Sequence, residues 1–214
     1  KSSTASRTRS WGASWRLAAI DRSHKRISGS RDLKLLLFDI DHTLLASGGA
    51  GFRAMNRAFA EIYGVEEATR GIVPDGKTDP MLFEEAIRNA PAIETDEAQA
   101  IAVLTSAYER YLPEAMTAPP ARIMPGATAL LKELTTRPGV LLGLLTGNLE
   151  STAFAKLRVF GLDRYFSFGA FGSDDRDRLK LPPIAVQRAE ELTGAAVGLG
   201  PHVVVIGDTQ RDVI

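Results

Sequence analysis

Leu35-Leu36-Leu37-Phe38-Asp39-Ile40-Asp41-His42-Thr43 is the stretch that decides the fold. An apolar run of strand length ends here in two carboxylates, Asp39 and Asp41. In an extended chain, residues i and i+2 share one face, roughly 6.5 to 7 Å apart. A buried parallel strand over 33–39 would place both acids at its carboxyl end, where open α/β sheets bind ligands. One carboxylate can then attack an electrophile while the other transfers protons; the alternative is a strand followed by an acid-rich turn.

Apolar runs and helical patterns alternate along the chain from residue 33 onward. The apolar runs predict four strands, over 33–39, 140–145, 165–170 and 203–206. The helical periodicity predicts six helices, near 52–63, 79–89, 95–112, 126–136, 150–160 and 183–193. Strands separated by helices indicate parallel pairing with right-handed crossovers. We therefore predict an α/β fold with a Rossmann-like three-layer core.

The gap between the first two predicted strands is the anomaly in this pattern. It spans about 100 residues, far more than a simple crossover needs. Between 52 and 113 the sequence is almost wholly helical in pattern. We predict an inserted α-helical subdomain over 51–118, with the core formed by 32–50 and 119–214.

Composition limits the chemistry that is open to the protein. The 214 residues are 44% hydrophobic, which suits one α/β domain with an insert. The absence of cysteine excludes disulfides, thiolate catalysis and zinc–thiolate sites. The three histidines are scattered, which argues against a histidine-rich metal site. No apolar run approaches the roughly 20 residues of a membrane span, so we expect no membrane partner and a cytoplasmic location.

The first 31 residues differ from the rest of the chain. They carry eight Lys or Arg and a single acid, Asp21, and they are rich in Ser and Thr. We interpret residues 1–31 as a disordered leader outside the fold. An organellar transit peptide and a nucleic-acid-binding arm are the functional alternatives. We expect no nucleic-acid partner.

Two further motifs follow the second and third predicted strands. Thr146-Gly147-Asn148 places a hydroxyl beside exposed backbone N–H groups at the start of a helix, which suits a phosphate or oxyanion. The alternative is an ordinary Thr/Asn helix cap. Lys180 precedes the helix at 183–193 and could neutralise phosphoryl charge, as could Arg178 two residues earlier.

A final pair of acids, Asp208 and Asp212, follows the fourth predicted strand. Hard cations need clustered oxygen ligands, and Mg²⁺ typically takes one or two carboxylates with phosphate oxygens and water. These acids, with those after the first strand, are candidate ligands of such an ion.

Taken in order, these four motifs resemble those of the haloacid dehalogenase superfamily. The resemblance spans roughly residues 33–214, and the helical insert resembles the family's cap subdomain, of the type in phosphoglycolate-phosphatase-like members. It implies that Asp39 is the nucleophile and that Asp41 protonates the leaving oxygen and then activates water. Thr146 and Lys180 would hold the phosphoryl group, with Gly147 and Asn148 beside it.

The resemblance also implies a Mg²⁺ site. Asp39, Asp208 and the backbone carbonyl of Asp41 would bind the ion, and Asp212 would support it. A carboxylate that attacks a phosphate dianion requires such charge neutralisation. Asp41 favours a phosphatase over a dehalogenase, because a halide leaving group needs no proton and an alkoxide does.

The expected function is thus Mg²⁺-dependent hydrolysis of a small phosphorylated metabolite through an aspartyl-phosphate. The alternatives are a phosphoglucomutase-like phosphotransferase with the same motifs and an inactive fragment. The sequence departs from the family at His42, where Gly is usual, and at Leu181, where Pro is common. It also ends at Ile214, so we expect a truncated core with an uncovered sheet edge.

The segment 71–78 fits the pattern of a nucleotide-binding P-loop. That pattern needs a strand directly before it, whereas 63–70 are polar and helix-like. We therefore favour a cap loop, from which Lys77 or Thr78 would touch substrate; a solvated loop with no role is the alternative.

Overall fold

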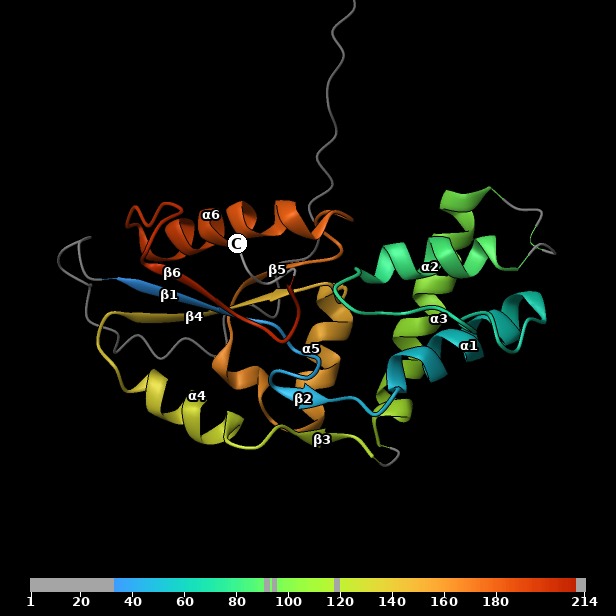
Figure 1. Cartoon of the computed structure of the whole chain (residues 1–214), viewed down its shortest axis with the longest axis horizontal. Helices are drawn as coiled ribbons and strands as arrows, with labels where there is room; N and C mark the ends of the chain where they lie inside the picture. Colours follow the sequence, from blue (N-terminus) through green and yellow to red (C-terminus); the bar gives the residue numbers. More distant parts are fainter. Residues whose placement is uncertain (1–32, 91–92, 94–95, 118–119, 211–214) are drawn as a thin grey trace, which may run out of the picture.

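The core of the molecule is a four-stranded parallel sheet (Figure 1). This computed structural model describes residues 33–90, 93, 96–117 and 120–210, so the predictions for residues 1–31 and for Asp212 lie outside it. The strands are β1 (Lys34–Phe38), β4 (Val140–Thr146), β5 (Gly169–Phe171) and β6 (Val203–Ile206), in the order β5-β4-β1-β6. The predicted α/β class with a parallel sheet is confirmed.

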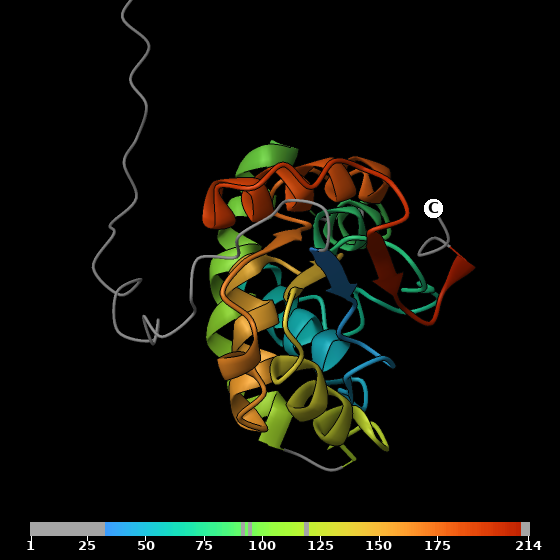
Figure 2. The same ribbon diagram turned by 90° about the vertical axis from the view of Figure 1, so that its left-hand side faces the viewer.

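Helices cover both faces of the sheet. α6 (Leu181–Thr193) lies on one face, and α4 (Ala127–Thr135) and α5 (Glu150–Val159) lie on the other (Figure 2). Side chains alternate between the faces of a strand, so Leu35 and Leu37 of β1 pack with residues of α6. Phe38 packs in the opposite cluster, with residues of α4 and α5. Because the sheet is covered on both faces, residues 35–38 of β1 form a continuous apolar run.

The chain leaves the core after β2 (Leu45–Ala46) and returns at β3 (Arg122–Ile123), and these two strands pair with each other in antiparallel fashion. Between them lie α1 (Ala50–Tyr63), α2 (Asp79–Arg88) and α3 (Glu97–Thr117), to one side of the sheet (Figure 1). We call residues 50–117 the helical insert. α3 packs on both α1 and α2 and also on α5 of the core. The exact division into core and cap stays a prediction.

Several boundaries differ from those that the sequence predicts. α3 continues past the predicted end at residue 112, through Pro113 to Thr117, with Met116 buried. Part of the strand predicted over 165–170 is instead a 3₁₀ turn, η1 (Asp163–Tyr165), and the strand begins only at Gly169. A second turn, η2 (Arg178–Lys180), leads directly into α6, whose first turn contains two prolines.

The segment 71–78, which resembles a P-loop in sequence, and residues 64–70 before it form turns and loop, with no strand among these described residues. It therefore lacks the strand that a P-loop requires. Nor does any helix in the described part of the chain have the length and apolar character needed to cross a bilayer.

The helical insert is docked directly against the loops that follow β4 and β5. The N–H of Asp79 donates to the carbonyl of Gly147 at 2.7 Å, and the Thr78 hydroxyl donates to the carbonyl of Arg176 at 2.9 Å. The fit is close, because a Cβ at Gly147 would lie 2.3 Å from the carbonyl oxygen of Lys77. Glycine is thus required at 147 by steric contact with the insert.

Replacing Gly147 with Ala should therefore weaken the docking of the insert. We expect Gly147→Ala to lower the free energy of unfolding by about 1–3 kcal/mol, as overpacking does elsewhere. Urea unfolding measures this. Gly200→Ala is the matched control, since its Cβ would meet nothing within 4 Å. Equal stability of the two variants would contradict the docking described here.

Candidate active site

A cavity of about 190 Å³ lies at the carboxyl ends of the strands. Asp39 follows β1, Thr146 ends β4 and Asp208 follows β6, and all three line this cavity. The parallel register of β1 with both of its neighbours brings these strand ends to one edge of the sheet. His42 also lines the cavity and has a φ of 59°, so it occupies the left-handed conformation in which Gly is usual.

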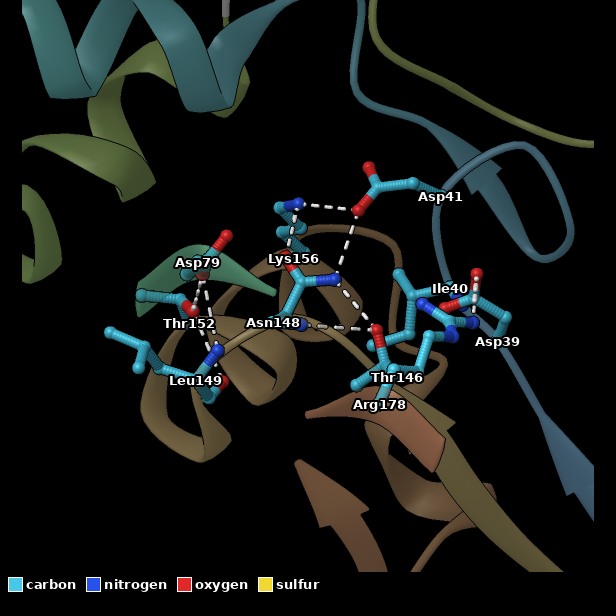
Figure 3. Close-up of polar contacts among 10 residues, drawn as sticks. All are labelled: Asp39, Ile40, Asp41, Asp79, Thr146, Asn148, Leu149, Thr152, Lys156 and Arg178. Carbon is cyan, nitrogen blue, oxygen red and sulfur yellow. Dashed lines mark hydrogen bonds and ion pairs between the residues drawn. The ribbon is translucent and has the colours of Figure 1, made fainter. Parts of the chain in front are cut away.

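Asp39 is buried, with only 5% of its surface exposed. Its Oδ1 accepts a hydrogen bond from the N–H of Ile40 at 2.8 Å, and its Oδ2 lies 3.0 Å from a guanidinium nitrogen of Arg178 (Figure 3). Burial raises the pKa of Asp39, and repulsion from Asp41 adds to this, although Arg178 opposes the shift. Asp39 is therefore a carboxylate whose negative charge is stabilised mainly by one buried cation.

Asp41 has different surroundings. Its Oδ2 accepts from the Lys156 ammonium at 2.6 Å and from the Asn148 amide at 3.0 Å (Figure 3). Burial alone would raise the pKa of Asp41, but Lys156 and these hydrogen bonds lower it below its usual value. Its Oδ1 is buried and has no hydrogen-bond partner among the residues that the structure describes. One oxygen is thus held by two donors, and the other has none among these residues.

Asn148, in the loop after β4, contacts both Asp41 and Lys156. Its amide nitrogen donates to the Thr146 hydroxyl at 2.8 Å as well as to Asp41, and its carbonyl accepts from Lys156. Thr146 and Asn148 are both buried. The predicted motif Thr146-Gly147-Asn148 therefore lies beside Asp41, as the strand order requires.

The structure brings Arg178, and not Lys180, to the cavity. Lys180 is 63% exposed in its side chain and pairs with Asp175 at 3.2 Å, whereas the side chain of Arg178 is 5% exposed. Both residues lie in η2. Since a 3₁₀ turn has three residues per turn, side chains two positions apart cannot point the same way. Once Arg178 faces Asp39, Lys180 faces solvent.

Lys156 is a site residue that the sequence motifs do not predict. It lies on α5 with 4% of its surface exposed, and burial alone would lower its pKa. Asp41 and Asp79 reverse that effect and raise the pKa of Lys156. A signal was present, because the buried stripe of α5 contains Thr152, Ala153, Lys156 and Leu157. A lysine in the buried stripe of a helix requires charged partners.

Asp79 is another such residue, and it comes from the helical insert. Its Oδ2 accepts from the N–H of Leu149 at 3.1 Å and from the Thr152 hydroxyl at 3.3 Å, at the start of α5 (Figure 3). The Tyr108 hydroxyl, from α3, also hydrogen-bonds Asp79. Burial raises the pKa of Asp79 to about 6, against the opposing effect of Lys156. The first turn of a core helix is therefore capped by a carboxylate of the insert.

The residues that would hold a metal are only partly within the described chain. Asp39 and Asp208 line the same cavity, whereas Asp212 lies outside the described residues. No cluster of three or more acidic or histidine ligands occurs in the described part of the chain. Two carboxylates facing one cavity nevertheless fit Mg²⁺, which takes its other ligands from water and phosphate.

The predicted substrate residue Lys77 also lines the cavity, on the side of the helical insert. Its ammonium lies 2.5 Å from Oε2 of Glu85, on α2. Gly147 and Asn148, the other predicted binding residues, line the same cavity, and Gly147 lies directly against the backbone of Lys77.

Fold and site together define an α/β enzyme whose central strand supplies two carboxylates, each paired with a buried cation. The family model for haloacid dehalogenase-like hydrolases matches residues 33–214, and the chain belongs to that family. The family predicted from the four motifs, and with it a hydrolase, is confirmed. No curated protein sequence matches the chain.

Solved structures of this fold resemble the chain over most of its length. CbbY of Rhodobacter sphaeroides, solved with phosphate, is 21% identical with a TM-score of 0.61, covering 84% of this chain and 79% of that one. A predicted phosphoglycolate phosphatase of Haemophilus somnus is 20% identical with a TM-score of 0.60, covering 86% and 81%. Protein Tyrosine Kinase A of Mycobacterium tuberculosis is 26% identical with a TM-score of 0.52, covering 86% and 78%.

The raised pKa of Asp79 has a consequence for stability. A carboxyl whose pKa is higher in the folded than in the unfolded chain favours folding when protonated, and that contribution is lost as the pH rises from about 4 to about 6. Asp79→Asn keeps a hydrogen-bond acceptor and carries no charge. The free energy of unfolding of Asp79→Asn, relative to that of the wild type, should therefore increase as the pH rises through this range, by up to about 3 kcal/mol.

Urea unfolding between pH 4 and pH 8 measures this difference. Glu66, an exposed residue of the insert, supplies the control, since Glu66→Gln should show no such trend. A difference between Asp79→Asn and wild type that is the same at every pH would contradict the assignment.

Proposed function

We propose that the protein is a Mg²⁺-dependent phosphatase that hydrolyses a small phosphate monoester through a phosphorylated Asp39. The observation that carries this proposal is the unequal treatment of two carboxylates that are two residues apart. Asp39 is paired with Arg178, and Asp41 is held by Lys156 and Asn148 with one buried oxygen left unpaired. Carboxylates placed in different environments take different catalytic roles.

In the first step, a carboxylate oxygen of Asp39 forms a bond to phosphorus and the bond from phosphorus to the ester oxygen breaks. The leaving oxygen takes a proton from Asp41. Arg178 and the Thr146 hydroxyl hold the phosphoryl oxygens, so that negative charge develops beside preorganised donors. The dianion of the ester also competes with Asp41 for the Lys156 ammonium, which returns the pKa of Asp41 toward the range where it is protonated.

In the second step, Asp41, now a carboxylate, takes a proton from water. The resulting nucleophile attacks phosphorus, the bond from phosphorus to Asp39 breaks, and inorganic phosphate leaves. Asp41 thus serves as general acid in the first step and as general base in the second, and it ends the cycle protonated as it began. The helical insert lines the cavity and is hydrogen-bonded to the core, and it would therefore limit the entry of bulk water.

Asp39, Asp208 and the backbone carbonyl of Asp41 would hold the Mg²⁺ ion, with Asp212 as a further carboxylate nearby in sequence. A bound Mg²⁺ supplies positive charge that offsets the repulsion between the substrate dianion and the carboxylates.

Phosphoryl transfer to a second hydroxyl, as in a phosphoglucomutase, is the alternative reaction of the same residues. One protein that this chain resembles is named as a tyrosine kinase. Release of inorganic phosphate, measured alongside any phosphorylated acceptor, separates hydrolysis from transfer.

The direct test is turnover of a panel of phosphate monoesters with and without Mg²⁺. We expect hydrolysis that EDTA abolishes, and a loss of at least about a thousandfold in Asp39→Asn, because the nucleophile is removed. Asp163→Asn, which lies in η1 away from the cavity, should match the wild type. Failure of the wild type to hydrolyse any ester, or retention of activity by Asp39→Asn, would refute the proposal.

The identity of the phosphate-binding cation is open to a second test. We expect Arg178→Lys to lower kcat/KM by about a hundredfold, as the loss of an oriented donor does, because lysine lacks the planar fork of arginine. Lys180→Ala should stay within about threefold of wild type, since its ammonium points to solvent. Steady-state kinetics on both folded variants decide the matter, and the reverse order of effects would assign the role to Lys180.

A further inference from the structure

The part of the cavity that would receive the leaving group is formed by the helical insert. Asp41 and residues of the insert line the same cavity, so a leaving oxygen that takes its proton from Asp41 would lie beside the insert. Four large side chains of the insert form an apolar wall there: Phe52, Met55, Leu82 and Tyr108. These side chains present mostly carbon atoms to a leaving group.

Among the described residues on the insert side of the cavity, Lys77 is the only cation, and its charge is already offset. Its ammonium lies 2.5 Å from the Glu85 carboxylate, with the two side chains 22% and 33% exposed. A pair with this degree of burial is screened less than a surface pair. Glu85 lies behind Lys77 on α2 and does not itself line the cavity.

Two further carboxylates, Asp75 and Asp79, line the same side of the cavity. The charge of Asp79 is offset by Lys156, but Asp75 has no such partner among the described residues, so a leaving group that carried its own carboxylate or phosphate would meet the like charge of Asp75. It would also have to displace Glu85 to gain the Lys77 ammonium. Charges of like sign brought together in this way are strongly disfavoured. A neutral alcohol faces neither cost.

We propose that this site selects phosphate monoesters of small neutral alcohols, and that Glu85 is the specificity-determining residue, because it neutralises Lys77 and so excludes anionic leaving groups. This inference rests on the proposed phosphatase function and adds to it a substrate class. It also distinguishes the chain from a phosphatase whose leaving group is an acid. Discrimination here comes from an unfavourable contact with the wrong substrate.

Two compounds of nearly the same shape test the proposal. 2-Hydroxyethyl phosphate and 2-phosphoglycolate differ in that a neutral CH₂OH replaces a carboxylate. We expect the wild type to favour 2-hydroxyethyl phosphate in kcat/KM by at least about tenfold, the effect of facing unscreened like charge. Glu85→Gln should lower the ratio of kcat/KM for 2-hydroxyethyl phosphate to that for 2-phosphoglycolate by about tenfold, since it releases Lys77 to pair with the carboxylate of phosphoglycolate.

Two controls isolate the ion pair. Glu66→Gln removes the same charge from an exposed position of the insert and should leave the ratio unchanged. In Lys77→Gln/Glu85→Gln, the gain on phosphoglycolate should disappear, because the released cation is absent. A wild type that prefers phosphoglycolate, or a ratio that Glu85→Gln does not move, would overturn the proposal.

Binding of the same two compounds to Asp39→Asn, measured by calorimetry in Mg²⁺, separates this proposal from the proposed catalysis. A preference for 2-hydroxyethyl phosphate that Glu85→Gln removes supports the specificity even if no ester is turned over. If the panel of esters is hydrolysed but Asp39→Asn binds the two compounds equally, the phosphatase function stands and the role of Glu85 fails. Absence of binding by both compounds also counts against it.

Discussion

The buried ammonium of Lys156 is the constraint on which the rest of the site depends. Moving a cation out of water costs several kcal/mol unless charged partners surround it. Those partners come from two distant parts of the chain, Asp41 after β1 and Asp79 at the start of α2. The lysine itself lies on α5, so the central strand, a core helix and the insert must all be assembled before its charge is compensated. The same arrangement that stabilises the fold therefore orders the groups that do the chemistry.

The pairing of cations with acids also explains how two aspartates so close in sequence come to differ. Burial acts on both, and by itself it would raise the pKa of each. For Asp39 the effect of burial prevails over that of Arg178, whereas for Asp41 the contacts with Lys156 and Asn148 prevail. Asn148 cannot be replaced in this role by an ordinary helix cap, because its amide contacts Thr146, Asp41 and Lys156 at once. Asn148, from the motif after β4, thus helps to lower the pKa of Asp41, from the motif after β1.

Sequence alone predicts the strands and helices and the edge of the sheet where the acids meet. It can do so because apolar runs and helical periodicity are local properties, and because parallel strands share one carboxyl edge. It does not distinguish Arg178 from Lys180, since the direction of each side chain depends on a short 3₁₀ turn that periodicity does not reveal. Asp79 and Lys156 enter the site through contacts across 70 and 115 residues of sequence, which no local pattern encodes. For Lys156 the buried stripe of α5 gave a signal, but the identity of its partner required the fold.

The segment that resembles a P-loop shows how the insert takes part in the site. Its last residues contact protein where a P-loop would contact phosphate: Lys77 pairs with Glu85, and the buried Thr78 hydroxyl donates to the carbonyl of Arg176. Arg176 lies only two residues before Arg178, and the next residue after Thr78 caps α5. Movement of the insert away from the core would therefore disturb both cation-bearing segments together, the turn with Arg178 and the helix with Lys156. Because both segments face the carboxylates, access to the cavity and the electrostatic state of the two aspartates are coupled through residues 77–79.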